Sequence, residues 1–165
     1  MPVMSIAELS RDSFAPYGEV ITTEGARHFP INQGTTERYH ALATADTADG
    51  GGSTILSLFR AQPRALPLAI TVMERHPLGS QAFVPLHAQD DDAYLIVVAP
   101  PGDFNEQRMQ AFIARGMQGV NYAKGVWHHP LIALGRISDF LVMDRSGPGQ
   151  NCDEVTLDGR WQLAL

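Results

Sequence analysis

The chain has 165 residues, a mass of 18.0 kDa and a formal net charge of −6, with a pI near 5.4. Its length fits one domain with a sizeable core, and 44% hydrophobic with 18% charged residues is typical of a globular rather than a disordered chain. Because the net charge is negative and no basic run is present, we expect neither a nucleic-acid nor an anionic-membrane partner.

Cysteine usage and the apolar segments narrow the class further. Cys152 is the only cysteine, so the chain can form neither an intrachain disulfide nor a cysteine-based metal cluster. Residues 1–12 lack the charged and apolar regions of a secretory signal, and the apolar run at 93–101 is too short to span a bilayer. We therefore expect a cytoplasmic protein with a single domain over residues 1–165.

Helix signals occur at two places in the chain. Residues 5–8 have the spacing of a capping box, which predicts a short opening helix that Pro16 and Gly18 end. A second capping signal at 103–106 precedes apolar residues at helical spacing, and Gly116 is a suitable stop. The sequence therefore predicts a second helix between residues 103 and 116.

The remaining apolar runs are short, and Gly or Pro separates most of them, which is typical of strands. The predicted strands are Thr36–Leu42, Ser53–Phe59, Ala69–Arg75, Gln81–Pro85, Ala93–Ala99, Gly119–Tyr122, Val126–His128, Ile137–Met143 and Glu154–Leu157. Many short strands at this spacing predict a mainly β protein, an antiparallel barrel or sandwich with one or two short helices.

Residues 119–130 combine two adjacent histidines, a Trp, a Tyr, two turn glycines and the only lysine of the chain. Lys124 stands against eleven arginines, so this protein hardly uses lysine on its ordinary surface. Lys124, His128 and Asn121 are candidate site residues, because placed titratable groups gather at functional sites. The alternative is a structural turn.

Residues 74–85 predict a strand, a Pro-Gly turn and a second strand. In such a hairpin Glu74, His76 and Gln81 can project toward one concave face. Alternatively, His76 only caps a strand before Pro77, and Glu74 is solvated. Farther upstream, residues 38–40 (Arg-Tyr-His) form either an arm that reaches the site or a strand with a satisfied histidine.

The two histidine-bearing hairpins resemble the two motifs of the cupin superfamily, although the usual His-x-His pair is absent. Over almost the whole chain the sequence is similar to the ureidoglycolate lyase family of allantoin catabolism. The segments that carry this resemblance are residues 14–21, 32–40, 74–83, 121–130 and 144–154. The resemblance implies a cupin-like fold, a homodimer and cleavage of ureidoglycolate into glyoxylate and urea.

That reaction needs a base for the carbinol hydroxyl, an acid for the departing nitrogen and a cation for the carboxylate. His76 or His128 can be the base, because imidazole titrates near ~6.5. Lys124 or Arg38 can bind the carboxylate, and Arg38 offers bidentate geometry.

The other predicted contacts of the substrate are polar. Tyr39 is a candidate beside Arg38 on the possible arm. Gln81 and Asn121 can hydrogen-bond the ureido group or a metal-bound water.

A metal requirement is not expected from the residues. The candidate ligands are His76, Gln81 and His128, and a neutral Gln is a weak ligand. Glu74 adds a carboxylate only if the hairpin turns it inward. The family has been associated with nickel, so Ni²⁺ is expected at most as a stimulating ion, bound substoichiometrically.

Two other functions stay open at this point. One is a ureidoglycolate amidohydrolase, which releases ammonia in place of urea. The other is a non-catalytic cupin that binds a small carboxylic acid.

Overall fold

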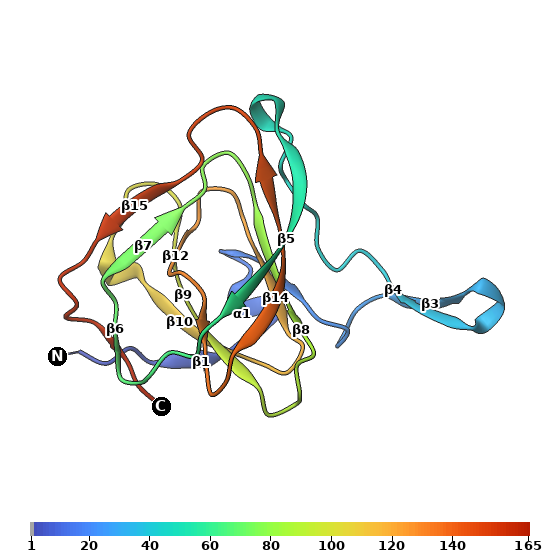
Figure 1. The fold of residues 1–165 in the computed structure, drawn as a ribbon, viewed down its shortest axis with the longest axis horizontal. Helices are drawn as coiled ribbons and strands as arrows, with labels where there is room; N and C mark the ends of the chain where they lie inside the picture. Colours follow the sequence, from blue (N-terminus) through green and yellow to red (C-terminus); the bar gives the residue numbers. More distant parts are fainter. Residues whose placement is uncertain (1) are drawn as a thin grey trace.

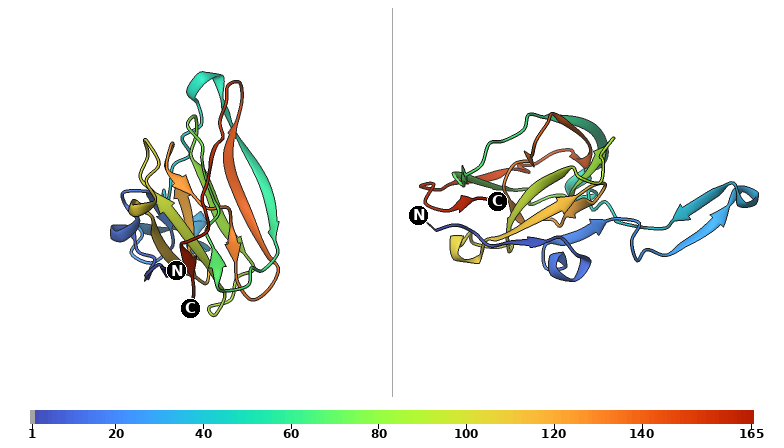
Figure 2. Two further views of the ribbon diagram at one scale, coloured as in Figure 1. Left: turned by 90° about the vertical axis from the view of Figure 1, so that its left-hand side faces the viewer. Right: turned by 90° about the horizontal axis from the view of Figure 1, so that it is seen from below.

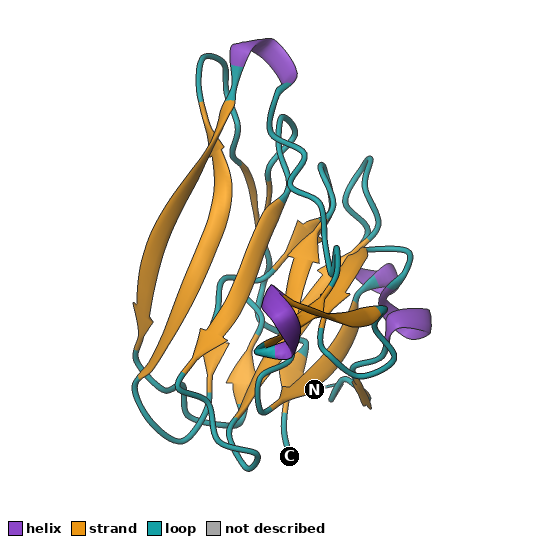
Figure 3. Cartoon of the chain, turned by 90° about the vertical axis from the view of Figure 1, so that its right-hand side faces the viewer, coloured by secondary structure: helices purple, strands orange, loops and turns teal. Residues whose placement is uncertain are grey.

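The computed structural model describes residues 2–165. Two β-sheets pack against each other, and the few helical turns lie at their margins (Figures 1 and 3). The helical segments are α1 (Arg11–Phe14), η1 (Asn32–Gly34), η2 (Asp49–Gly51) and η3 (Glu106–Arg108). The expectation of a mainly β protein with largely antiparallel sheets and only short helices is confirmed. Among the described residues, no helix is long and apolar enough to cross a membrane.

The first sheet has seven strands in the order β1-β10-β9-β12-β7-β15, with β13 also paired with β9. Their bounds are β1 (Ile6–Glu8), β7 (Val72–Arg75), β9 (Ala93–Ala99), β10 (Gln110–Arg115), β12 (Trp127–His128), β13 (Ile132–Ala133) and β15 (Asp153–Thr156). All pairings are antiparallel except that of β1 with β10.

The second sheet has five strands in the order β2-β11-β8-β14-β5. Their bounds are β2 (Gly18–Ile21), β5 (Ser53–Ala61), β8 (Gln81–Leu86), β11 (Gly119–Tyr122) and β14 (Ser138–Ser146). Strands β6 (Leu68–Ala69) and β16 (Gln162–Leu163) form a separate short pair. Each strand that the apolar runs predicted overlaps an observed strand.

One core cluster lies between the two sheets and a second lies on the other face of the seven-stranded sheet. The first contains Phe83 and Phe140 of one sheet with Ile96 and Phe112 of the other. Aromatic rings meet edge to face there, which is a favourable arrangement for buried rings. Strands β9 and β10 are therefore covered on both sides, and β9 pairs with β12, which in turn pairs with β7.

The helix predicted between residues 103 and 116 is wrong. Residues 110–115 form β10, which pairs along its whole length with β9. Phe112 packs into the core between the sheets, while Met109 and Ile113 pack into the second cluster. A strand buried on both faces reads as a continuous apolar run, so its period of two is hidden and a helical spacing can be matched by accident.

The opening helix is shorter and later than predicted. Residues 6–8 form β1, and helix α1 follows it. The helix is capped by Ser10, whose hydroxyl accepts from the Ser13 backbone N–H while the Ser13 hydroxyl accepts in return from the Ser10 N–H. The residues with capping-box spacing at 5–8 instead join the edge of the large sheet through β10.

A two-stranded hairpin projects from the body (Figures 1 and 2). It consists of β3 (His28–Ile31) and β4 (Thr36–Tyr39), which pair only with each other. The tip is η1, in which Asn32 and Gln33 have positive φ. The segment with Arg38 is therefore an arm in its shape, as one of the two sequence interpretations held.

Candidate active site

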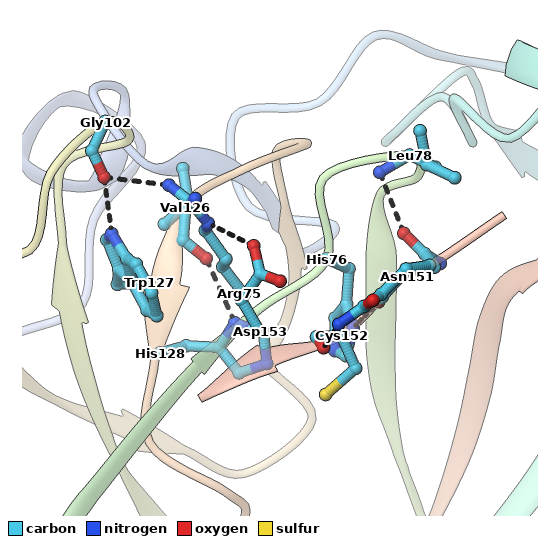
Figure 4. A network of polar contacts seen from close by, with 11 residues as sticks. Arg75, His76, Leu78, Gly102, Val126, Trp127, His128, Asn151, Cys152 and Asp153 are labelled. Carbon is cyan, nitrogen blue, oxygen red and sulfur yellow. Dashed lines mark hydrogen bonds and ion pairs between the residues drawn. The ribbon is translucent and has the colours of Figure 1, made fainter. Parts of the chain in front are cut away.

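A cavity of about 350 Å³ opens between the two sheets. Strands β5, β7, β8 and β12 and the turn after β12 contribute its walls. The lining residues are Phe59, Arg60, Ala61, Glu74, Gln81, Phe83, His128, Pro130 and Leu131. The predicted candidates His128 and Gln81 thus meet in one cavity, and His76 lies beside them, with its ring centroid 5.1 Å from that of His128 (Figure 4).

Glu74 faces both histidines. It is the direct cross-strand partner of His128 in the β7–β12 pair, and such partners share a face of the sheet. Its Oε1 lies 3.4 Å from His128 Nε2 and 4.0 Å from His76 Nε2. The contact with the His128 imidazole is the main cause that lowers the pKa of Glu74. The hairpin therefore turns the carboxylate inward, which the sequence permitted but did not require.

His128 is almost completely buried, with 2% of its surface exposed. Its ring stacks on Tyr122 at a centroid distance of 4.3 Å with an interplanar angle of 4°. The Nδ1–H donates to the Val126 carbonyl oxygen at 3.2 Å, and Nε2 has no hydrogen-bond partner. Burial lowers the pKa of His128 below its ordinary value. Burial thus favours the neutral form of this histidine, in which Nδ1 carries the proton and Nε2 faces the cavity beside Glu74.

His76 is held by two hydrogen-bond acceptors. Its Nδ1 lies 2.7 Å from the Asn151 carbonyl oxygen, and its Nε2 lies 3.1 Å from Gln81 Oε1. The Gln81 amide orientation follows from its Nε2, which donates to Asp144 Oδ2 at 3.1 Å. The Nδ1–H therefore donates to the Asn151 carbonyl oxygen, and a proton on Nε2 would be donated to Gln81 Oε1.

The segment after β14 positions His76, a role that the sequence left unassigned. Besides accepting from His76, Asn151 uses its side-chain oxygen to accept from the Leu78 N–H at 2.8 Å. Arg145 is buried and donates to the carbonyl oxygens of Asp49 and Pro148, at 2.8 Å each. The Asn151 bonds hold His76 against this segment (Figure 4), and the Arg145 bonds tie the segment to the loop that carries Asp49.

Asn121 and Lys124 point elsewhere. Tyr122 of β11 faces His128, so its strand neighbour Asn121 faces the opposite side. There the Asn121 amide donates to Glu19 Oε1 at 3.0 Å and to the Thr44 carbonyl oxygen at 2.9 Å. The structure therefore does not bring Asn121 to the cavity that holds His128.

Lys124 is ion-paired at the rim. Its ammonium binds the Asp49 carboxylate and lies 3.3 Å from Asp46 Oδ2. The hydrogen bond with Asp49 is the main cause that raises the pKa of Lys124, and it lowers the pKa of Asp49 in turn. The ammonium is thus a permanent cation whose charge two carboxylates already neutralise.

Arg38 and Tyr39 lie on the projecting hairpin, away from the cavity of their own chain (Figure 1). Tyr39 stacks on His28 at 5.2 Å, and His28 in turn pairs with Glu37 at 2.7 Å. Both Arg38 and Tyr39 are exposed. Within one chain the structure therefore separates these two candidates from the histidines.

The residues also fit a divalent ion, and the structure brings Glu74 to the two predicted histidine ligands. Donor atoms of Glu74, His76 and His128 lie within 4.8 Å of one another. The buried Nε2 of His128 has no partner, and a carboxylate with two imidazoles suits ions such as Ni²⁺ or Zn²⁺ better than a neutral amide does. The third predicted ligand, Gln81, lies beside them, with its Oε1 3.1 Å from His76 Nε2.

Comparisons with known proteins extend over the whole chain. The family described as "Ureidoglycolate lyase" matches residues 1–164. A ureidoglycolate lyase of Burkholderia cepacia is 60% identical over 98% of this chain and 90% of the relative. One of Azotobacter vinelandii is 54% identical over 100% of this chain and 98% of the relative, and one of Pseudomonas syringae pv. tomato is 49% identical over 100% and 96%.

The chain belongs to the ureidoglycolate lyase family. The resemblance read from the sequence is thus confirmed. Among solved structures, a dTDP sugar isomerase from Desulfovibrio desulfuricans G20 aligns with a TM-score of 0.42 and 14% identity, over 88% of this chain and 87% of that one.

Reasoning from single residues missed three members of this ureidoglycolate lyase site. Tyr122, Asp144 and Asn151 support His128, Gln81 and His76. Asp144 and Asn151 lie in the Gly-rich segment 144–154, to which the sequence assigned no role. Tyr122 lies in the motif at 119–130 and had no assigned role either. The repeated association of Gly-rich turns with Asn and Asp was the available signal.

Proposed function

We propose that this protein cleaves ureidoglycolate into glyoxylate and urea by acid–base catalysis, as a cytoplasmic enzyme of allantoin and purine breakdown. The carrying observation is a buried His128 whose Nε2 has no hydrogen-bond partner, beside a His76 whose two ring nitrogens face acceptors. One ring is thus ready to accept a proton and the other to donate one.

In the proposed reaction, His128 Nε2 takes the proton of the carbinol hydroxyl. The hydroxyl oxygen becomes the aldehyde oxygen of glyoxylate, the carbon–nitrogen bond breaks, and its electron pair stays on the nitrogen. His76 then delivers the proton of Nε2, which otherwise binds Gln81, to that nitrogen. Glu74 lies between the rings and stabilises whichever of them is protonated.

The products separate this function from the two alternatives. Purified protein supplied with racemic ureidoglycolate should release urea and glyoxylate in equal amounts without ammonia. Ammonia in place of urea would indicate an amidohydrolase. Binding of glyoxylate without any turnover would indicate a non-catalytic cupin.

The first prediction concerns which cation, Lys124 or Arg38, binds the carboxylate of the substrate. That role for Lys124 stays a prediction, but Lys124 would have to leave Asp46 and Asp49 to fulfil it. Arg38 forms no ion pair among the described residues, and a charged hydrogen bond lost on Arg38→Met should weaken glyoxylate binding about tenfold or more. Glyoxylate affinity of both variants can be measured by calorimetry, and Lys124→Met should lower it less than Arg38→Met does. A larger loss in Lys124→Met would assign the role to Lys124.

The metal prediction concerns the Glu74–His76–His128 set. A bound Ni²⁺ would supply a Lewis acid for substrate oxygens. The two histidines provide the base and the acid when no ion occupies their nitrogens, so we expect measurable urea release after chelation. With an ion on this set, polarisation of substrate oxygens would replace that route, and added Ni²⁺ should then stimulate. Glu74→Gln should remove the stimulation. Elemental analysis before and after chelation is the check, and complete loss of activity that one ion restores would make these residues ligands first.

We also propose a homodimer in solution. The edge strand β5 exposes large apolar side chains, among them Leu56 at 66% and Leu58 at 53%. Exposed apolar side chains gathered on one edge strand mark an interaction surface, and two-fold dimers are the commonest oligomers. Light scattering should give twice the 18.0 kDa mass of the chain, and a monomeric mass at micromolar concentration would contradict the dimer.

A further inference from the structure

The cavity of one chain lacks a free guanidinium or ammonium group. Arg60 is the one arginine or lysine among its described lining residues, and its guanidinium donates to both carboxylate oxygens of Asp139 at 2.9 and 3.1 Å. The acidic residues in and beside the cavity, Glu74 and Asp144, are paired only with imidazole or amide groups. A substrate carboxylate would therefore enter an acidic site with no guanidinium or ammonium to hold it.

The projecting hairpin carries the missing charge. The register of β3 and β4 places Phe29 opposite Arg38 and Ile31 opposite Thr36, so these four side chains share one face. This face combines two apolar side chains with a guanidinium that has no acidic partner among the described residues. A two-stranded hairpin is marginally stable alone, so this one needs a surface to lie on.

The mouth of the cavity offers such a surface. Phe59 of β5 lines the cavity and stacks edge to face on Phe83 of the core, yet remains 40% exposed. Ile55, on the same face of β5, is 41% exposed. The mouth is thus apolar at its β5 wall and acidic inside, and the hairpin face is apolar with one cation.

We propose that the hairpin of one subunit lies across the cavity mouth of a second copy of this chain, where Arg38 binds the carboxylate of the substrate. Phe29 and Ile31 pack on the β5 wall of the partner, and the guanidinium enters the cavity beside Glu74 and His128. Each active site is then shared between two subunits. This inference rests on the proposed function for the identity of the substrate. Its geometry rests on the match between the apolar, cationic hairpin face and the apolar, acidic cavity mouth.

Mixing two impaired variants tests the exchange. Arg38→Met lacks the cation and His128→Gln lacks the base. After unfolding and refolding together in equal amounts, half of the dimers are mixed, and each mixed dimer contains one site with both groups intact. At substrate concentrations below KM, urea release should recover to about a quarter of the wild-type rate. If Arg38 served its own chain, no mixed dimer would contain an intact site, and absence of recovery would overturn the proposal.

A second mixture is the matched control. His128 and Glu74 both line the cavity of their own chain. In a mixed dimer of His128→Gln and Glu74→Gln each cavity therefore has one altered residue, no site is intact, and no recovery is expected. Recovery in this control equal to that of the first mixture would also overturn the exchange.

A third measurement separates failure of the exchange from failure of the proposed function. If wild-type protein releases no urea, the lyase assignment fails, and light scattering on a variant with residues 28–39 replaced by a short Gly-Ser turn then tests docking alone. Loss of the dimer would support hairpin docking on a second copy. An unchanged dimer would overturn it.

Discussion

His128→Gln should lower kcat by about 10²–10⁴-fold, because the variant loses the general base while keeping a polar group in its place. The ring of His128 is buried against Tyr122. Loss of that stacked pair should cost about 0.5–1.5 kcal/mol, so thermal melting must show that the variant is folded at the assay temperature. Near-normal turnover would remove His128 from the mechanism, and a loss that follows the fraction unfolded would make it structural.

The pH profile of the wild type checks the same assignment independently. A base works only when it is unprotonated, and burial lowers the pKa of His128. The acidic limb of kcat/KM should therefore lie below pH ~6.5, the ordinary value for histidine, and activity should persist on mild acidification. An acidic limb above that value would exclude His128 as the group that titrates.

His76→Gln is the second large expected effect, a fall in kcat of about 10²–10⁴-fold from loss of the general acid. The companion variant Asn151→Ala keeps the carbonyl oxygen that accepts from His76 but loses the side chain that binds the Leu78 N–H. We expect it to lower kcat less than His76→Gln does, because His76 stays in place but is held less firmly.

Substrate dependence distinguishes these roles from simple loss of fold. An altered acid should lower kcat with little change in KM, whereas a disordered loop should change both. Equal rates for wild type and His76→Gln would contradict the acid role.

Much of this fold was readable from the sequence because its strands are bounded by Gly and Pro. Strand β14 buries Phe140 and Val142 between partly exposed neighbours, so it keeps the period of two. β10 lacks it, since Phe112 and Ile113 are both buried, in different clusters. Residue periodicity reports which faces are buried, and it fails where both are.

The site was readable in part for a similar reason. His76, Gln81 and His128 stood out by residue type within predicted hairpins, and their convergence is confirmed by the cavity. The inward turn of Glu74 depends on the β7–β12 register, and the support from Asn151 depends on a contact across 75 residues of sequence. Such long-range pairings are set by the tertiary fold, so no local spacing could have predicted them.

The proposed roles of His128 and His76 require carbon–nitrogen cleavage without attack by water on the ureido carbonyl, and turnover in H₂¹⁸O tests this directly. Glyoxylate exchanges its aldehyde oxygen with water through its hydrate, so urea is the product to read by mass spectrometry. Acid–base collapse of the carbinol predicts unlabelled urea, formed in equal amount to glyoxylate. Carbon dioxide and ammonia without urea would show that water attacks the ureido carbonyl, and would contradict the roles proposed for His128 and His76.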